Sequence, residues 1–553
     1  MTSHDDHQEG SAPVRNVLFI MCDQLRWDAL SCAGQSLIDT PNIDRLAARG
    51  VRFDRAFVQG VVCGSSRMSY YTGRYVQSHG ARWNQIPLRL GQRTMGDHLR
   101  PLGVRTVLIG KTHFAADRDG LARLGLDPDD PEVVYLAQCG FEPTERDDGL
   151  HPDRLVPDDL PYNRFLRANG FDEPNPWNSV ANSVIDHRGD VVSGWLLRSS
   201  PHPAIVPDEL SETAYMTDRA IDFMTEAGEE RWCAHLSFIK PHWPYVVSDP
   251  YHRLVDPDDV PPAHRSPAER ANEHPVLAAF RNARIGATFS RDEVRRAVVP
   301  AYLGLVAQID HHLGRLFDAM ARLGRLDDTM IVFTSDHGDY LGDHYQGDKD
   351  WFHEEAVRVP MIVVDPRPAA DATRGTAESG LMEAVDLLPT FIDALGGDTT
   401  AAEPWLEGRS LVPLLHGAAP LDRSAAVSEA DYGFLEMANL LPATDRPRDR
   451  RATMLRTQRY KYILSETGPN LLYDLDDDPD EFHDRIDDPA LAAVQSELHE
   501  QLFTWFRTRA HDTTFGDADL RRRSTAGATA RLGILIGYWD EDHLAQAMAT
   551  PTP

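Results

Sequence analysis

The sequence lacks any long apolar run. No stretch of its 553 residues approaches the roughly 18 uninterrupted apolar residues that a membrane-spanning helix needs. Residues 1–10 are polar and acidic, whereas a secretory signal would be basic and then apolar. We therefore expect a soluble, cytoplasmic protein that does not insert into membranes.

Basic residues are scarce relative to acidic ones. The chain has 56 Lys and Arg against 86 Asp and Glu, so its formal net charge at pH 7 is −30. Proteins that bind nucleic acids without sequence preference need basic stripes that displace phosphate counterions, and docking on anionic lipid needs basic patches. The charge balance therefore argues against both nucleic acid and a membrane surface as partners.

Cysteines are few and scattered. The chain has five, none of them paired at the spacing of a structural zinc site: Cys22, Cys32, Cys63, Cys139 and Cys233. So few thiols in so long a chain exclude a disulfide scaffold. We expect four of them to be small buried apolar residues, and Cys63 to be different because of the residues around it.

The sequence does contain a regular alternation of strand-like and helix-like segments. Helical patterns include 41–49, with Thr40 as N-cap and Pro41 at the first position, and 303–320, where apolar residues recur every three or four positions. Between such segments lie short apolar runs typical of strands buried on both faces, at 17–22, 106–109, 233–238, 330–335 and 361–364. This alternation predicts an α/β protein with a mostly parallel central sheet and helices on both faces.

Two regions depart from the alternating pattern. Residues 115–210 are rich in Asp, Pro and Asn and predict a loop-rich insertion within a catalytic domain that spans 1–425. Residues 453–464 predict strands of a smaller antiparallel sheet, in a C-terminal α+β domain that spans 426–553. The apolar tail at 533–539 either caps the core or reaches a neighbouring subunit.

Polar side chains follow the predicted strands. Asp23, Lys111, His242 and Asp336 each come at or just after the end of one, and ligands bind at the carboxyl ends of strands in parallel sheets. Asp23, Asp336 and His337 together supply carboxylate and imidazole ligands, which suit Ca²⁺, Mn²⁺ or Mg²⁺. The alternative is that Asp336 caps a helix and His337 is an ordinary loop residue.

Residues 63–74 read Cys-Gly-Ser-Ser-Arg-Met-Ser-Tyr-Tyr-Thr-Gly-Arg. Cys63 lies just before a predicted helix, where free backbone N–H groups favour an anionic thiol or thiol derivative. Arg67 lies one turn later on the same face and could bind an oxyanion through two N–H groups.

This stretch resembles the signature Cys-x-Pro-Ser-Arg, followed by Thr-Gly-Arg, of the sulfatase family within the alkaline phosphatase superfamily. The resemblance extends along most of the chain and implies an alkaline-phosphatase-like fold. Its further segments occur in the family's order: 17–24, 110–113 (Gly-Lys-Thr-His), 240–244 (Lys-Pro-His-Trp-Pro), 335–349 with 355–360, and 472–481.

The resemblance implies a nucleophile and a metal site. In the family the cysteine is oxidised by a formylglycine-generating enzyme, and the hydrated aldehyde is the nucleophile, so Cys63 is expected to become formylglycine. One divalent cation, Ca²⁺ or Mn²⁺, is then held by Asp23, residue 63, Asp336 and His337.

The resemblance also implies roles for five other residues. After attack on sulfur or phosphorus, Arg67 and Lys111 balance the developing charge, while His242 and Lys349 protonate the leaving-group oxygen. His113 takes a proton from residue 63, so that the covalent ester collapses to the aldehyde and releases the anion.

Ser65 stands where the family usually has proline, which leaves an unconverted, non-catalytic anion-binding protein as an alternative. The pairs Asp23-Gln24 and Asp336-His337 are closer to the choline-sulfatase and phosphonate monoester hydrolase branches. Asn84 resembles a substrate-contacting asparagine of the latter branch. Because these branches use C-terminal extensions in oligomers, we expect a homo-oligomer, either a dimer or a tetramer.

The pair Lys111 and His113 bears on the substrate. It is the arrangement of sulfate monoester hydrolases, whereas phosphonate monoester hydrolases tend to have tyrosine and threonine there. We therefore predict arylsulfatase-type hydrolysis of a small-molecule sulfate ester. Hydrolysis of phosphonate monoesters or phosphodiesters in the same site is the alternative main activity or a promiscuous side activity, because these substrates also carry one negative charge.

Overall fold

The computed structural model describes residues 12–131, 133–271, 273–400, 405–433, 440–441, 450–509 and 541–549. The apolar segment predicted at 533–539 lies outside these residues. Among the helices that are described, none combines the length and the apolar character needed to cross a bilayer.

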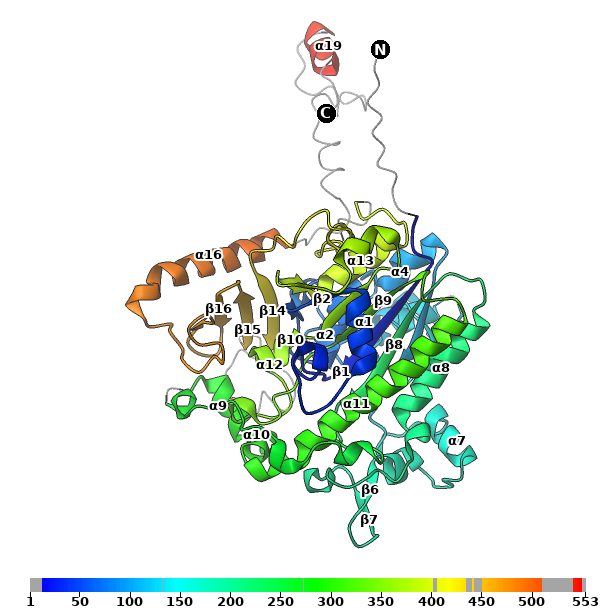
Figure 1. The fold of residues 1–553 in the computed structure, drawn as a ribbon. Helices are drawn as coiled ribbons and strands as arrows, with labels where there is room; N and C mark the ends of the chain where they lie inside the picture. The colour runs from blue at the N-terminus through cyan, green and yellow to red at the C-terminus, as the bar shows by residue number, and fades with distance from the viewer. Residues whose placement is uncertain are drawn as a thin grey trace.

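An eight-stranded sheet forms the centre of the molecule (Figure 1), in the order β12-β2-β11-β9-β1-β8-β4-β5. The strands β9, β1, β8, β4 and β5 run parallel to one another, and β11 runs antiparallel to β9 and β2. The predicted α/β class is confirmed. The bounds are β1 (Asn16–Asp23), β2 (Val51–Phe53), β4 (Arg105–Gly110), β5 (Glu142–Arg146), β8 (Trp232–Pro241), β9 (Thr329–Ser335), β11 (Met361–Val364) and β12 (Thr376–Glu378).

The central strand β1 shows why helices cover both faces of this sheet. Successive side chains of a strand point to opposite faces, and every residue of β1 is buried. Phe19 and Met21 pack in one core with α2, α4 and α13, while Leu18 and Ile20 pack in another with α1, α8 and α11. The bounds are α1 (Pro41–Arg49), α2 (Cys63–Thr72), α4 (Met95–Leu99), α8 (Glu212–Glu226), α11 (Asp292–Arg322) and α13 (Leu387–Ala394).

Helix α1 begins at Pro41, as predicted, and α11 contains the predicted helical segment 303–320. Thr40 is the N-cap residue, as predicted, but its hydroxyl accepts no amide of the first turn. Instead the carboxylate of Asp310 accepts the amides of Asn42 and Ile43, at 3.0 and 2.8 Å. A residue on the neighbouring helix therefore binds the free N–H groups that begin α1.

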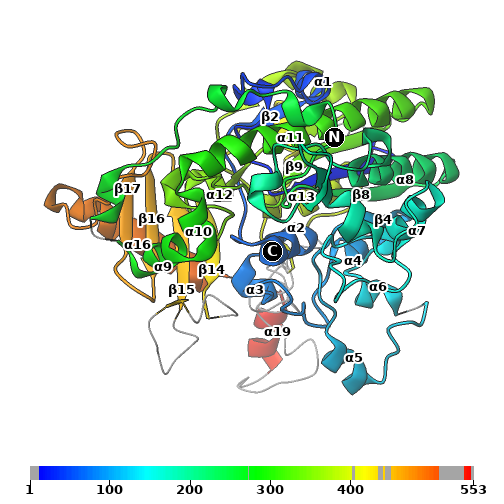
Figure 2. The ribbon, with the colours of Figure 1, turned by 90° about the horizontal axis from the view of Figure 1, so that it is seen from below.

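The segment 115–210 is more ordered than the expected loop-rich insertion. It adds β5 to the edge of the central sheet, beside β4, as well as several short elements, some labelled at the lower right of Figure 2 and the others in the lower part of Figure 1. These elements are α5 (Arg118–Leu124), α6 (Val134–Ala137), α7 (Pro161–Ala168) and the hairpin of β6 (Ser183–Ile185) and β7 (Val191–Ser193).

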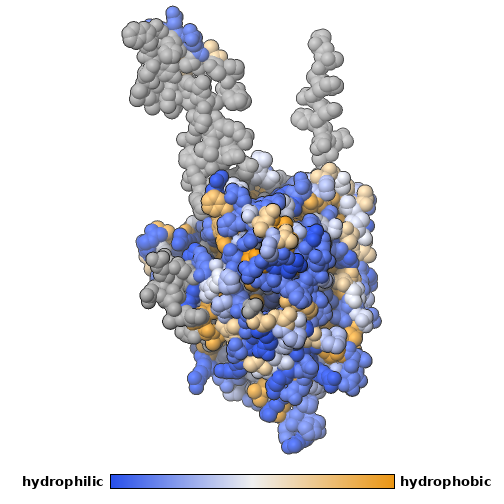
Figure 3. Space-filling model, turned by 90° about the vertical axis from the view of Figure 1, so that its left-hand side faces the viewer, coloured by the Kyte–Doolittle hydropathy of each residue, from blue (hydrophilic) through white to orange (hydrophobic). Residues whose placement is uncertain are grey.

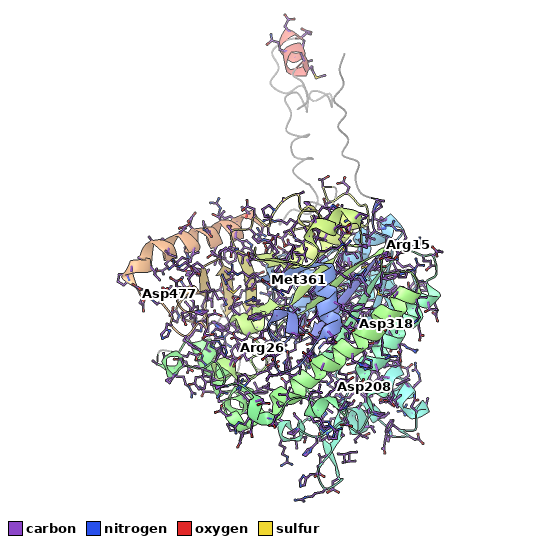
Figure 4. All side chains as sticks on the ribbon, viewed as in Figure 1. Arg15, Arg26, Asp208, Asp318, Met361 and Asp477 are labelled. Atoms are coloured by element: carbon purple, nitrogen blue, oxygen red, sulfur yellow. The ribbon has the colours of Figure 1, made fainter. Side chains whose placement is uncertain are left out.

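A four-stranded antiparallel sheet lies to one side of the central sheet (Figure 2), as predicted for the C-terminal region. Side chains of this sheet, including Leu472, pack against Leu498 and Leu502 of α16. Figure 4 labels Met361 at the crowded centre of the molecule and Asp477 at the outer side of this second sheet. The bounds are β14 (Ala426–Asp431), β15 (Arg451–Arg456), β16 (Tyr460–Ser465), β17 (Leu471–Asp474) and α16 (Ala492–Thr508).

The remaining elements are short. A three-stranded sheet joins β10 (Arg358–Val359), β3 (Ala56–Phe57) and β13 (Met382–Glu383). The other α-helices of the described residues are α3 (Val76–His79), α9 (Pro275–Asn282), α10 (Arg284–Phe289), α12 (Glu354–Val357), α14 (Val412–Leu415) and α19 (Glu541–Ala549). The face shown in Figure 3 is mostly hydrophilic, in keeping with the acidic composition.

The carboxyl ends of four central strands meet at one edge of the sheet. The register pairs Asp23 with Pro241, Gly110 with Ser237 and Cys22 with Ser335. The polar residues that end or follow β1, β4, β8 and β9 therefore share this edge, where α2 also begins.

Candidate active site

Four potential metal ligands come together from three segments. Asp23 ends β1, Cys63 opens α2, and Asp336 and His337 directly follow β9. One ligand atom from each lies within 4.8 Å of the others, and all four residues are buried. The structure therefore brings together the metal ligands that the sequence predicted.

The donor set fits a divalent cation. The Nδ1 atom of His337 lies 2.9 Å from the carbonyl oxygen of Gly338, which assigns its proton to Nδ1 and directs the lone pair of Nε2 toward Cys63, 3.1 Å away. Burial alone would lower the pKa of His337, but Asp336 and Cys63 raise it to about 9. A cation can replace this proton, because metal binding requires a neutral imidazole.

Cys63 is an acidic thiol. Burial and the Asp23 carboxylate both oppose its ionisation, but Lys349, Lys111 and His337 outweigh them and lower its pKa to about 5. Its position at the start of α2 adds the favourable field of the helix N-terminus. Because its sulfur lies 3.8 Å from Asp23 Oδ1 as well as close to His337, residue 63 is placed where a metal-bound nucleophile would be.

Arg67 holds the metal-binding carboxylates. Its Nε lies 2.8 Å from Asp336 Oδ2, its Nη2 lies 3.2 Å from Asp23 Oδ2, and its Nη1 donates to the Lys111 carbonyl and to Ser237 Oγ, both at 2.8 Å. The side chain is fully buried. All three nitrogens are thus used within the protein, so the structure does not support the predicted two-point clamp on a substrate oxyanion.

Lys111 and His113 follow β4 on one turn. Lys111 Nζ lies 2.5 Å from Asp23 Oδ2, and although burial opposes its charge, Asp23 and Cys63 raise its pKa. His113 is half-buried, and its Nδ1 has no hydrogen-bond partner among the described residues. Lys111 is therefore a fixed positive charge, whereas the imidazole of His113 has a nitrogen left for a ligand or proton.

His242 and Lys349 form the other side of the site. Nζ of Lys349 lies 3.5 Å from His242 Nε2, 3.1 Å from Gln24 Oε1 and 2.9 Å from Asp348 Oδ1. Burial lowers the pKa of His242 well below its usual value. For Lys349 burial acts in the same direction, but Asp348 and Cys63 outweigh it and raise the pKa well above the usual value. A neutral imidazole therefore lies beside an ammonium group.

Asn84 lies beside residue 63. Its Oδ1 accepts the amide of Gly64 at 2.7 Å. This contact fixes the carboxamide at the first turn of α2, and the predicted role of Asn84 in substrate binding remains a prediction.

Gln24 is a site residue that the sequence reasoning missed. Its Nε2 donates to Asp339 Oδ2 at 2.6 Å while its Oε1 accepts from Lys349, and its amide donates to Asp336 Oδ1 at 3.0 Å. The signal in the sequence was its position directly after Asp23 at the end of β1. Gln24 thus links the carboxylate of Asp336 to Lys349 on the other side of the site.

His344 and His353, which also follow β9, lie outside the group of metal ligands. Their rings stack 3.8 Å apart, and His344 Nδ1 lies 2.7 Å from Glu269 Oε2. Burial opposes its charge, but Glu355 and Glu269 raise the pKa of His344 to about 10. The stacked rings and the contact with Glu269 thus connect three segments of the chain near the turn that carries Asp336 and His337.

A buried cluster of two carboxylates, an imidazole and an acidic thiol, at the carboxyl edge of an α/β sheet, fits a hydrolase of the alkaline phosphatase superfamily type. Comparison with known families agrees: the family model "Sulfatase" matches residues 15–397, and the model "N-sulphoglucosamine sulphohydrolase, C-terminal" matches residues 342–507. The chain belongs to the sulfatase family.

Individual relatives span several activities. The multifunctional alkaline phosphatase superfamily protein PehA of Trinickia caryophylli is 31% identical over 524 residues, which are 90% of this chain and 96% of the relative. The choline-sulfatase of Rhizobium meliloti is 26% identical over 543 residues, covering 96% of this chain and 94% of the relative. The structure of a phosphonate monoester hydrolase from Silicibacter pomeroyi is similar with a TM-score of 0.75 at 28% identity, covering 90% of this chain and 96% of that one.

Proposed function

We propose that this chain hydrolyses sulfate monoesters of the arylsulfatase type and releases inorganic sulfate, using formylglycine formed from Cys63 and one Ca²⁺ or Mn²⁺ ion. The observation that carries the proposal is the position of residue 63. It lies at a helix N-terminus beside the Asp23, Asp336 and His337 ligand atoms, and the charges of Lys111 and Lys349 favour its anionic form.

When bound, the cation would lower the pKa of a coordinated hydroxyl and offset negative charge on the substrate oxygens. Arg67 holds both ligand carboxylates in one orientation. Lys111 supplies a fixed positive charge that matches the negative charge developing in the transition state.

Lys349 and His113, at the edges of the site, transfer the protons. Lys349, beside the neutral His242, donates a proton to the leaving-group oxygen. His113, whose Nδ1 has no hydrogen-bond partner among the described residues, takes a proton from the second hydroxyl of the hydrated residue 63. As the aldehyde re-forms, the bond from residue 63 to the transferred group breaks and the anion leaves.

Phosphonate monoester or phosphodiester hydrolysis in the same site is a second candidate. The similarity to two phosphonate monoester hydrolase structures, from Silicibacter pomeroyi and Agrobacterium radiobacter, favours it, each with a TM-score of 0.75. The pair Lys111 and His113 at the site favours the sulfate ester instead, because this pair is the arrangement that sulfate monoester hydrolases share.

The ratio of kcat/KM for 4-nitrophenyl sulfate and for its phenylphosphonate analogue tests the choice. We expect the larger value with the sulfate. A large preference for the phosphonate would overturn the proposal in favour of the second candidate.

Mass analysis of the peptide that contains Cys63, from protein made in its native host, tests the shared part of both proposals. We expect formylglycine at this position. A free thiol in all molecules, together with no turnover of either substrate, would indicate the non-catalytic alternative that Ser65 raises.

A further inference from the structure

The turn that carries Lys111 and His113 belongs to no helix or strand and has an unfavourable backbone conformation. His113 has φ = +54°, in the left-handed region, which costs a non-glycine residue on the order of 1–2 kcal/mol. Its Nδ1 is buried without a partner among the described residues. The position of this imidazole is therefore set mainly by the conformation of the His113 backbone.

One carboxylate oxygen binds that backbone. Asp148 Oδ1 accepts the amides of Thr112 and His113, each at 2.9 Å, and lies 3.3 Å from the Thr112 hydroxyl. Two consecutive N–H groups that point at one oxygen fix the peptide between them. They are also groups that a strained turn would otherwise leave without partners.

Arg146, the last residue of β5, completes the arrangement. Its Nε and Nη2 lie 3.0 and 2.7 Å from Asp148 Oδ2, and Nη2 also donates to the carbonyl of Phe114 at 2.7 Å. Burial opposes ionisation of Asp148, but Arg146 and the two amides hold its pKa well below the usual range. Asp148 thus binds the two amides of the turn, and Arg146 binds the carbonyl of Phe114, the residue that follows His113.

The position of the pair follows from the sheet. Arg146 is in register with Gly110, the last residue of β4, and the amide of Asp147 donates to the Gly110 carbonyl at 3.1 Å. Residues that follow β5 therefore lie beside those that follow β4, although 35 positions separate Asp148 from His113 in the chain.

We propose that Asp148, supported by Arg146, is a positioning residue for the reaction: it fixes His113 and Lys111 in the active site by binding the backbone that joins them. The inference rests on the proposed function of His113 in proton transfer. Asp148 itself contacts neither the metal ligands nor residue 63 through any of these hydrogen bonds.

Steady-state kinetics of Asp148→Ala and Asp148→Asn test the inference. We expect Asp148→Ala to lower kcat by about 10²-fold, because a small misplacement of a catalytic group has effects of this size, with KM within a factor of about three. Asp148→Asn keeps an oxygen acceptor for the two amides but turns its NH₂ group toward the donors of Arg146, so it should recover part of the loss. Equal losses in both variants, or a change in KM alone, would overturn the proposal.

Asp186→Ala is a matched control. Its Oδ1 also accepts two backbone amides, of Arg188 and Asp190 at 2.8 and 3.0 Å, but in the exposed turn between β6 and β7. This variant should keep the kcat and KM of the wild type. A similar loss of kcat in Asp186→Ala would mean that loosening any turn of this kind slows the enzyme, which would also overturn the proposal.

Hydrogen exchange provides a readout that does not depend on turnover. In Asp148→Ala the amides of Thr112 and His113 should exchange at least tenfold faster, about 1.4 kcal/mol of lost protection, with the melting temperature close to that of the wild type. Unchanged exchange would refute the anchoring role. An inactive wild-type enzyme would refute the proposed function instead, and the exchange measurement would still decide whether Asp148 anchors this turn.

Discussion

Cys22 and Cys63 are two buried thiols near the carboxylate of Asp23, yet their pKa values shift in opposite directions from the usual value of a thiol. Cys22, inside β1 next to Asp23, is 0% exposed, and Cys63, at the start of α2, is 1% exposed. Burial, reinforced by Asp336 and Asp23, raises the pKa of Cys22 well above its usual value, whereas the pKa of Cys63 falls to about 5.

The difference shows that the surrounding charges, more than burial, decide which cysteine can carry chemistry here. Cys22 packs in the apolar core between β1 and the helices on one face of the sheet. Cys63 lies where strands end and a helix begins, within the influence of Lys111, Lys349 and His337. The surroundings of Cys22 therefore suit packing in the core, whereas the surroundings of Cys63 suit an ionised side chain.

Alanine substitutions of Cys63 and Cys22 should give the largest difference, one in activity and the other in stability. Cys63→Ala removes the nucleophile and should lower kcat/KM by at least about 10⁴-fold while the protein stays folded. Cys22→Ala leaves a small cavity and should lower the free energy of unfolding by about 1 kcal/mol with little change in kcat/KM. Kinetics with 4-nitrophenyl sulfate and thermal melting check both; activity retained in Cys63→Ala would contradict the assignment of residue 63.

Removal of the cation should have the next largest effect. Chelation leaves Asp23, Asp336 and His337 without the charge they are arranged to bind. It should lower kcat by about 10³-fold, because a metal contributes several kcal/mol of transition-state stabilisation. Adding Ca²⁺ or Mn²⁺ back should restore the rate.

The melting temperature provides a second measurement of the same effect. It should fall when the wild type is chelated, because binding to the folded state alone stabilises it. In Asp336→Asn, which weakens the site, chelation should change the melting temperature less. A rate in the wild type that does not respond to chelation would contradict the metal site.

Much of this site could be predicted from the sequence, because strand ends are marked by local patterns. Asp23, Lys111, His242 and Asp336 each come at or after an apolar run, and a parallel sheet brings such ends to one edge. The capping of α1 by Asp310, the turn of Gln24 toward Lys349, and the anchoring of His113 by Asp148 could not be predicted. These contacts join segments that are far apart in the chain, and they depend on side-chain directions that no local pattern records.

Arg67 illustrates the same limit, and its replacement should have an intermediate effect. The sequence indicated a cation near the site, whereas the structure shows a guanidinium with all three nitrogens bonded inside the protein. In Arg67→Lys one ammonium cannot reproduce this planar arrangement, so the cation affinity should fall 10- to 100-fold. Titration of the chelated protein with Ca²⁺ measures this change.

Arg105→Lys is the control for this substitution. Arg105 lies at the opposite end of β4 and pairs with Glu142 and Glu230 near the surface. Its replacement should leave the Ca²⁺ affinity unchanged. Equal affinities in Arg67→Lys and the wild type would mean that the orientation of Asp23 and Asp336 does not depend on Arg67.

Proline at position 65 should have the smallest effect on the fold and on the rate per active site. The amide of Ser66 donates to Val62 and is the first i→i−4 hydrogen bond of α2, so the ladder does not need the amide of residue 65. Ser65→Pro loses the hydrogen bond from its hydroxyl to the Val62 carbonyl at 3.1 Å and should change the free energy of unfolding by only about 1 kcal/mol. Because it restores the family signature, it should raise the fraction of residue 63 found as formylglycine.

Ser69→Pro is the matched contrast, because it lies in the middle of α2, where proline removes a ladder hydrogen bond and costs about 3 kcal/mol or more. Mass analysis of the peptide that contains residue 63 measures the converted fraction, and kcat per converted site should be equal in Ser65→Pro and the wild type. If Ser65→Pro raised kcat per converted site, residue 65 would act in the reaction itself. If the converted fraction did not rise, Ser65 would not be the residue that limits the maturation of Cys63.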